Sequence, residues 1–286
     1  MHVLEWRWPL VAVAAGVVLL ASGPASAQID LSGEWDARVH EDQPERGPGP
    51  EIADYLGIPI NEAARFAGHA HNPALLTVPE YQCRPHPADY ASRHSEFRIW
   101  KTVDPQTRQV VSWNTHKRWQ EQVRTIWMDG RPHPPEFAPH TWQGFSTGEW
   151  VGNILKVTTT HLKKSYLRRN GLPRSDAATL VEYFIRHDNV LTWVSIVDDP
   201  VYLTEPYVRT SDYEIDPEQV IEAYPCSYVV EIDRPKDEVP HYLPGTNPYL
   251  TEFSERHHLP AEAAEGGAAT MYPEYQKMLR GAAASN

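Results

Sequence analysis

The segment from Trp142 to Pro206 constrains the fold most, because short apolar runs alternate there with residues that turn the chain. Ile154–His161 is rich in β-branched residues, and Thr179–His187 mixes aromatic and branched ones. Val190–Asp198 follows after the turn residues His187-Asp188-Asn189. Strand, turn and strand in this order are typical of an antiparallel meander. We therefore expect a mainly β fold.

Runs with strand character also lie on both sides of this segment, at Leu31–Val39, Ser95–Thr102, Arg108–Thr115, Gln122–Met128, Tyr207–Ile215 and Ser227–Ile232. Together they predict eight or nine strands. A short helix is expected over Ile60–Gly68, where Asn61 is a favourable N-cap and Gly68 ends the helix. We expect residues 28–234 to form one domain with this helical insertion. Residues 235–286, rich in proline, should form a wrapping tail with helical runs at Tyr249–His257 and Tyr272–Arg280.

The N-terminus has the pattern of a secretory signal peptide. Arg7 precedes an apolar run from Val11 to Leu20, and the small residues Ala25-Ser26-Ala27 follow. The run is shorter than the roughly 20 residues that span a bilayer, although a membrane anchor is the alternative. We expect cleavage before Gln28, a periplasmic or secreted protein, and no integral membrane segment after cleavage.

Charge and cysteine content narrow the partners and the compartment. The formal net charge is −12, and the basic runs are no longer than Lys163-Lys164 or Arg168-Arg169. This argues against a nucleic-acid partner. Two cysteines in an exported chain predict one disulfide between Cys83 and Cys226, worth about 4–5 kcal/mol in the chain-entropy model. Reactive thiols are the alternative.

Several spaced motifs lie between the two cysteines: MDGRPHP from Met128 to Pro134, GxSxGxWxG from Gly144 to Gly152, GxPxSD from Gly171 to Asp176, and DPxYxxxP from Asp199 to Pro206. This set resembles a large, mostly uncharacterised group of exported bacterial proteins, whose members also have one cysteine on each side of the block. The resemblance covers about half the chain. It implies a lipocalin-like, calycin-type antiparallel β-barrel and brings no established catalytic mechanism. Gly33-x-Trp35 is also similar to the opening of lipocalin-like barrels.

Four titratable residues form a candidate acid–base group: His161, Asp176, Glu182 and His187. If the strands that carry them pair antiparallel, their side chains meet near one rim. A histidine beside a carboxylate is the minimum for acid–base chemistry near neutral pH. This supports a cofactor-free lyase, hydratase or isomerase as one hypothesis. The alternative is that Glu182 and Arg186 form an ion pair on the surface of the sheet.

Aromatic and basic residues form a candidate ligand site. Ten tryptophans and 14 tyrosines occur in the chain, and on strands they fill a barrel or line its cavity. Basic groups among them would hydrogen-bond a carboxylate, phenolate or sugar-like ligand. The candidates are Trp113, His116, Arg118, Arg124, Trp127, Arg131, His133, Trp142 and Trp193. The leading hypothesis is a binding protein for a small, partly apolar ligand, with aromatic compounds included.

Other classes of function have weaker support from the sequence. The 14 histidines include His69-Ala70-His71 but no arrangement typical of zinc sites. We therefore predict no metal ligands and no cofactor, with metal binding by histidines as the alternative. Ser146 has the letters of a nucleophile elbow without its strand-to-helix context, which predicts a turn residue. A structural protein that docks through its tail is a third hypothesis, and a tail exchanged between subunits would make an oligomer.

Overall fold

The computed structural model describes residues 28–38, 50–72, 82–90, 95–118, 123–222, 225–227, 236–237 and 241–283. The expected signal peptide and most of the expected strand Ser227–Ile232 lie outside the described residues. The chain divides into two compact units, Met1–Asp30 and Leu31–Asn286. The fold described below is that of the second unit.

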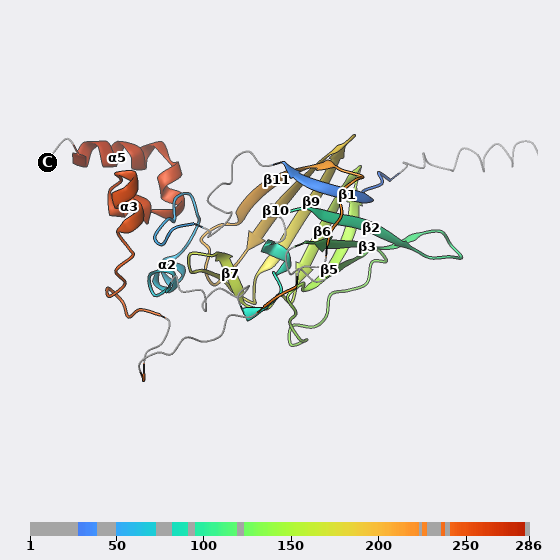
Figure 1. Cartoon of the computed structure of the whole chain (residues 1–286), viewed down its shortest axis with the longest axis horizontal. Helices are drawn as coiled ribbons and strands as arrows, with labels where there is room; N and C mark the ends of the chain where they lie inside the picture. Colours follow the sequence, from blue (N-terminus) through green and yellow to red (C-terminus); the bar gives the residue numbers. More distant parts are fainter. Residues whose placement is uncertain are drawn as a thin grey trace, which may run out of the picture. The chain divides into compact units, whose positions relative to one another are not determined.

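Nine strands of the described residues close into a barrel, in the order β1-β11-β10-β9-β6-β5-β4-β3-β2 (Figure 1). Their bounds are β1 Gly33–Arg38, β2 Phe97–Val103, β3 Val110–Lys117, β4 Arg124–Trp127, β5 Phe145–Val151, β6 Ile154–Thr160, β9 Thr179–His187, β10 Val190–Asp198 and β11 Tyr207–Ile215. The mainly β fold is confirmed. Two-residue turns join β5 to β6 and β9 to β10, with positive φ at Gly152 (62°) and Asp188 (52°), as tight hairpins require.

One pair of neighbouring strands is parallel rather than antiparallel. Ile126 of β4 lies opposite Ser146 of β5, and Trp127 lies opposite Thr147. The other barrel pairs among the described strands are antiparallel. The connecting segment, residues 128–144, contains four prolines and does not form a hairpin. It returns the chain to the end of the barrel where β4 began, so the expectation of an entirely antiparallel barrel is wrong at this junction.

Alternate residues of each strand point into the barrel. On β9 the buried positions are Leu180, Glu182 and Phe184, and on β10 they are Leu191, Trp193, Ser195 and Val197. This period of two is the expected geometry of a strand with one buried face. The interior also holds Trp35, which is fully buried and donates its indole N–H to the Leu31 carbonyl (3.1 Å).

One hydrophobic core joins the barrel to the insertion before β2. Helix α2 (Glu62–His69) begins at the expected N-cap, Asn61, whose side chain accepts a hydrogen bond from Ala64 N (3.0 Å). A small hairpin, β7 (Ser165–Arg168) and β8 (Leu172–Arg174), packs beside it. The shared core consists of Ile52, Ala53, Tyr55, Ile58, Ile60, Ala64, Ala88, Leu162, Leu167, Leu172, Ala178, Leu180, Val197 and Leu203. Because Leu180 and Val197 belong to β9 and β10, this core covers the end of the barrel where those two residues lie.

The C-terminal segment attaches to the insertion. It contains α3 (Glu252–His257), α4 (Ala261–Ala264), the 3₁₀ turn η5 (Gly267–Met271) and α5 (Pro273–Ala283). Tyr55 N donates to the Ala264 carbonyl (3.1 Å), and Gly57 N donates to the Gly267 carbonyl (3.0 Å). Helices α3 and α5 overlap the two helical runs expected in this segment, Tyr249–His257 and Tyr272–Arg280. No helix in the described ranges has the length and apolarity needed to cross a membrane.

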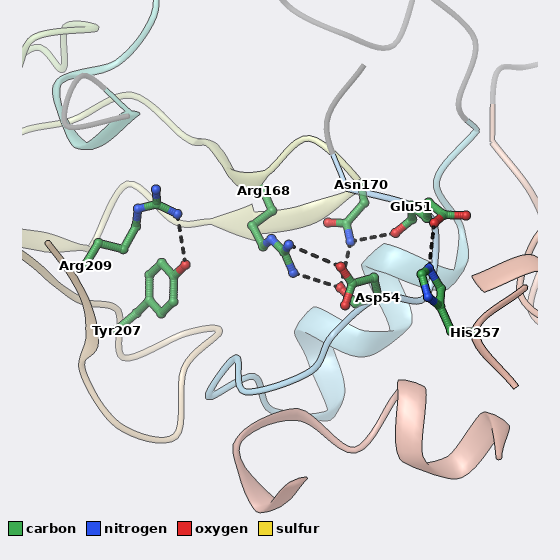
Figure 2. A network of polar contacts seen from close by, with 7 residues as sticks. All are labelled: Glu51, Asp54, Arg168, Asn170, Tyr207, Arg209 and His257. Atoms are coloured by element: carbon green, nitrogen blue, oxygen red, sulfur yellow. Dashed lines mark hydrogen bonds and ion pairs between the residues drawn. The ribbon is translucent and has the colours of Figure 1, made fainter. Parts of the chain in front are cut away.

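Polar contacts hold the insertion from two sides (Figure 2). Arg168 of β7 donates to the backbone carbonyl of Asp54 (3.0 Å) and to its carboxylate (3.3 Å). Asn170 donates to the carbonyls of Glu51 and Asp54 (both 3.0 Å). From the tail, His257 Nε2 lies 3.3 Å from the Glu51 carboxylate. The insertion thus links the tail to the β7–β8 hairpin.

Three further connections join segments that are distant in sequence. Cys83 and Cys226 form the expected disulfide, across a separation of 143 residues. The fully buried Arg174 of β8 forms a two-pronged ion pair with Asp89 (3.1 and 3.0 Å), which lies in the 3₁₀ turn η4 (Ala88–Tyr90). Ser175 donates from its hydroxyl (2.6 Å) and its backbone N–H (2.7 Å) to Asp199. These two hydrogen bonds connect the GxPxSD motif, which contains Ser175, to the motif that begins at Asp199.

Candidate ligand site inside the barrel

A buried ion pair lies inside the barrel. Arg124 of β4 and Glu182 of β9 are 1% and 0% exposed, and Arg124 Nη1 donates to Glu182 Oε1 at 3.0 Å. Arg124 also donates to Ser146 Oγ (3.0 Å) and Thr159 Oγ1 (2.6 Å), while the indole N–H of Trp193 donates to Glu182 Oε1 (3.1 Å). Both charges are therefore compensated, as buried charges must be.

Lys117 occupies a second interior position, among aromatic rings. The residue is buried, and its Nζ donates to the hydroxyl of Tyr213 (3.2 Å). Nζ also lies 5.4 Å from the ring centroids of Phe97 and Trp193, and 5.3 Å from that of Tyr213. Cation–π attraction at these distances stabilises the ammonium ion. The same rings pack on one another, with Phe97 and Tyr213 edge to face at 4.6 Å.

Two buried donors on β3 have no hydrogen-bond partner among the residues that the structure describes. Trp113 Nε1 and Thr115 Oγ1 are both without one, although the residues are only 2% and 1% exposed. They lie on the same strand face as Lys117, two residues apart. Thr115 is opposite the buried Arg124 in the sheet, and Trp113 is opposite the buried Ile126. Both side chains therefore point into the barrel.

The inward face of β3 and β4 is consequently a wall of hydrogen-bond donors beside a group of aromatic rings. We call Trp113, Thr115, Lys117 and Arg124 the donor wall. An unmade buried hydrogen bond costs about 1–3 kcal/mol, so unpartnered buried donors call for an occupant such as a ligand or water. This arrangement suits an apolar molecule that carries a hydrogen-bond acceptor.

Three of the expected ligand residues, Trp113, Arg124 and Trp193, belong to this interior. The others lie elsewhere. His116 is half-buried on the outward face of β3, Arg118 pairs with Glu96 (3.4 Å), and Trp127 stacks under the guanidinium of Arg131 (3.6 Å to the centroid). Arg131 also pairs with Asp129, Trp142 lies near Lys163, and His133 is bound to two threonines outside the barrel. Strand alternation turns His116 and Trp127 outward, because only every second residue faces inward. Arg118, Arg131, His133 and Trp142 lie in the segments between strands.

The four residues of the expected acid–base group do not come together. Glu182 is inside the barrel and contacts Arg124 and Trp193, whereas His161 contacts Thr160 and Pro135. Asp176 and His187 are exposed. The alternative surface ion pair between Glu182 and Arg186 is also wrong. Arg186 instead lies over the Trp35 ring (5.2 Å).

His161 takes part in a different arrangement, a chain of hydrogen bonds that crosses the outer face of β5 and β6. The His161 Nε2 lies 2.9 Å from the Pro135 carbonyl, and its Nδ1 lies 2.7 Å from Thr160 Oγ1. His133 Nδ1 contacts the same Thr160 hydroxyl (2.8 Å), and its Nε2 contacts Thr147 Oγ1 (2.8 Å). This chain pins the segment of residues 128–144 against the barrel.

The carbonyl at one end of the chain fixes the direction of every proton in it. A carbonyl only accepts, so neutral His161 carries its proton on Nε2 and accepts from Thr160 at Nδ1. Thr160 then accepts from His133 Nδ1–H, and His133 Nε2 accepts from the Thr147 hydroxyl. Burial, with a smaller contribution from the nearby His161, lowers the pKa of His133 and favours this neutral form.

The sequence reasoning missed five interior residues: Thr115, Lys117, Ser146, Thr159 and Tyr213. A usable signal was present in the spacing Trp113-x-Thr115-x-Lys117, which places all three side chains on one face of a strand. Ser146 is not a turn residue, because it lies within β5 and contacts Arg124. Within the described ranges, no three His, Cys, Asp or Glu side chains are grouped so as to hold a metal ion.

Comparison with known proteins does not identify a function, so the functional assignment rests on the geometry of the site. No protein-family model, curated protein or solved structure matches this chain.

Proposed function

We propose that this protein is exported and binds a small, partly apolar ligand inside its barrel. The observation that carries the proposal is the pair of buried, unpartnered donors on β3, Trp113 Nε1 and Thr115 Oγ1. A ligand acceptor placed beside them would remove an unfavourable contribution of about 1–3 kcal/mol per donor. The aromatic rings of Phe97, Trp193 and Tyr213 would pack on the apolar body of the ligand.

Two further features support the same proposal. The resemblance to lipocalin-like barrels agrees with it, since such barrels hold one small ligand. The Cys83–Cys226 disulfide suits an oxidising compartment outside the cytoplasm. Export predicts that the protein recovered from the periplasm or medium begins at Gln28, which N-terminal sequencing tests.

The binding proposal is tested with N-phenylnaphthylamine, a neutral apolar dye that fluoresces when it leaves water. We expect saturable binding with one site per chain. Replacing Thr115 by Phe would place a ring in the proposed ligand space. The T115F chain should therefore still fold but bind the dye at least about tenfold more weakly, the loss of roughly one good contact.

The matched control is Val194→Phe, which adds a ring to the half-buried outward face of β10. This chain should bind the dye as the native protein does. Unchanged dye affinity in T115F, or no saturable binding by the native chain, would contradict the proposal. Thermal unfolding of both variants separates blocked binding from a disrupted fold.

A further inference from the structure

We infer that the donor wall selects a ligand whose polar end is an oxygen that accepts hydrogen bonds and carries no hydrogen, as in a ketone, an ester or a carboxylate. This inference rests on the proposed binding function and specifies the class of ligand. It follows from the chemistry of the four side chains that face inward from β3 and β4.

Three of the four residues in the donor wall cannot accept a hydrogen bond. The indole of Trp113, the ammonium of Lys117 and the guanidinium of Arg124 are donors only, and Thr115 alone also accepts. The acceptors near Arg124 are already engaged: Glu182, Ser146 and Thr159 all take part in its hydrogen bonds. If Thr115 accepts a hydrogen from a ligand, its own hydroxyl hydrogen is left without an acceptor, so the donor wall has no net capacity for an added hydrogen.

The positions of the two unpartnered donors define where the ligand oxygen would lie. Trp113 and Thr115 are two residues apart on one face of β3, a separation of about 7 Å between their Cα atoms. Both side chains lie on the same face of the sheet as Ile126 and Arg124, the residues opposite them on β4. A carbonyl or carboxylate there would accept from both donors. An alcohol would accept equally well but would leave one hydrogen without an acceptor, either its own or that of the Thr115 hydroxyl.

The rings beside the wall specify the rest of the ligand. Phe97 packs on Trp193 (5.4 Å) and on Tyr213 (4.6 Å), and Phe184 packs on Trp193 (4.7 Å). These rings present flat apolar surfaces next to Lys117. A flat or aliphatic body with one hydrogen-free oxygen at its end fits both parts of the site.

The test compares four probes built on one naphthalene ring with the substituent at the same position: acetylnaphthalene, naphthoate, naphthylethanol and ethylnaphthalene. Binding is measured by displacement of N-phenylnaphthylamine from the mature, oxidised chain. We expect acetylnaphthalene or naphthoate to bind at least about tenfold more tightly than naphthylethanol, the difference that one satisfied hydrogen bond makes. Whether the ketone or the carboxylate binds better decides between a neutral and an anionic ligand.

Two variants test whether Trp113 and Thr115 cause the preference for a hydrogen-free oxygen. Trp113→Phe removes the indole N–H, and Thr115→Val removes the hydroxyl while keeping the shape. Each should reduce the preference for the hydrogen-free oxygen several-fold and leave the affinity for ethylnaphthalene within about twofold of native. The controls are Trp142→Phe and Thr158→Val, which make the same chemical changes outside the barrel and should alter neither quantity.

The possible failures are distinguishable. Equal binding of acetylnaphthalene, naphthoate and naphthylethanol, with ethylnaphthalene still bound, would overturn the inference and keep the binding function. Unchanged preference in both W113F and T115V would overturn it as well. Failure of every probe to bind, ethylnaphthalene included, would overturn the proposed function and the inference together. If W113F does not fold, T115V decides the question.

Discussion

Glu182 shows how the role of a residue depends on which face of its strand is covered. The alternation of β9 correctly separates Glu182 from Val181, Tyr183 and Ile185, but it does not say which set faces inward. In a half-buried strand the apolar set is the usual choice. Here the inward set contains a carboxylate, because Arg124 on a distant strand compensates its charge.

Replacing Glu182 by Gln tests this compensation. The substitution leaves Arg124 as a buried charge without its counter-ion, so we expect a loss of about 3–5 kcal/mol in the free energy of unfolding. Urea denaturation measures it. The control is Glu149→Gln, which breaks an exposed ion pair with Lys156 and should cost no more than about 1 kcal/mol. A loss in E182Q as small as that in E149Q would mean that Arg124 has another buried partner.

His71 predicts a specific dependence of stability on pH. Burial lowers its pKa from 6.5 to about 4. The unfolded chain, with the higher pKa, takes up the proton first as the pH falls. The contribution of His71 to stability is therefore complete above about pH 6.5 and is lost between there and pH 4, by at most about 3 kcal/mol.

Replacing His71 by Gln should flatten the stability profile between pH 6.5 and 4 relative to the native chain. The replacement His187→Gln, at an exposed position of β9, serves as the control and should leave the profile unchanged. Denaturation midpoints measured across this pH range give the comparison. Parallel profiles for native and H71Q proteins would show that His71 is accessible to protons in the folded state.

The strands show which features of the fold a local sequence pattern can predict. Thr179–His187, Val190–Asp198 and Tyr207–Ile215 have in the structure the bounds that their sequence patterns indicate, because period-two alternation and turn residues are local properties. The parallel pairing of β4 with β5 is not local. It depends on residues 128–144 lying along the outside of the barrel, where His133 contacts Thr147 and Thr160.

Local sequence patterns also predicted only part of the candidate site. Arg124 and Trp193 were identified because basic and aromatic residues on strands were expected in a binding site. Lys117 was missed because lysine is rarely buried. The pairing of His161 with a carboxylate was wrong because the nearest strand neighbour of Glu182 on β6 is Val157, four residues before His161.

The hydrogen-bond chain through Thr160 predicts the tautomers of two histidines. Nitrogen NMR of the side chains should show the proton on Nδ1 of His133 and on Nε2 of His161. Thr160→Val breaks the chain between the two rings and should cost about 1–2 kcal/mol of stability. Thr158→Val, on the same outward face of β6, is the control and should cost less. The opposite tautomer at His161 would contradict the assignment, because the Pro135 carbonyl could not then accept from it.

In the whole molecule, the barrel, the insertion and the tail depend on long-range connections. The disulfide joins residues separated by 143 positions, which in the chain-entropy model contributes about 4–5 kcal/mol. The double replacement Cys83→Ala with Cys226→Ala should lower the free energy of unfolding toward that extent. Denaturation of the native chain with and without reductant provides a second measurement. Equal stability in all these forms would show that the unfolded chain is already constrained there.

Ligand binding in the barrel is most directly tested by a high-resolution crystal structure of the protein purified from the compartment to which it is exported. The account predicts continuous density for a small molecule inside the barrel, with an oxygen within hydrogen-bond distance of Trp113 Nε1 and Thr115 Oγ1. A barrel in which ordered water alone meets these two donors, or in which protein side chains fill the space beside them, would contradict it.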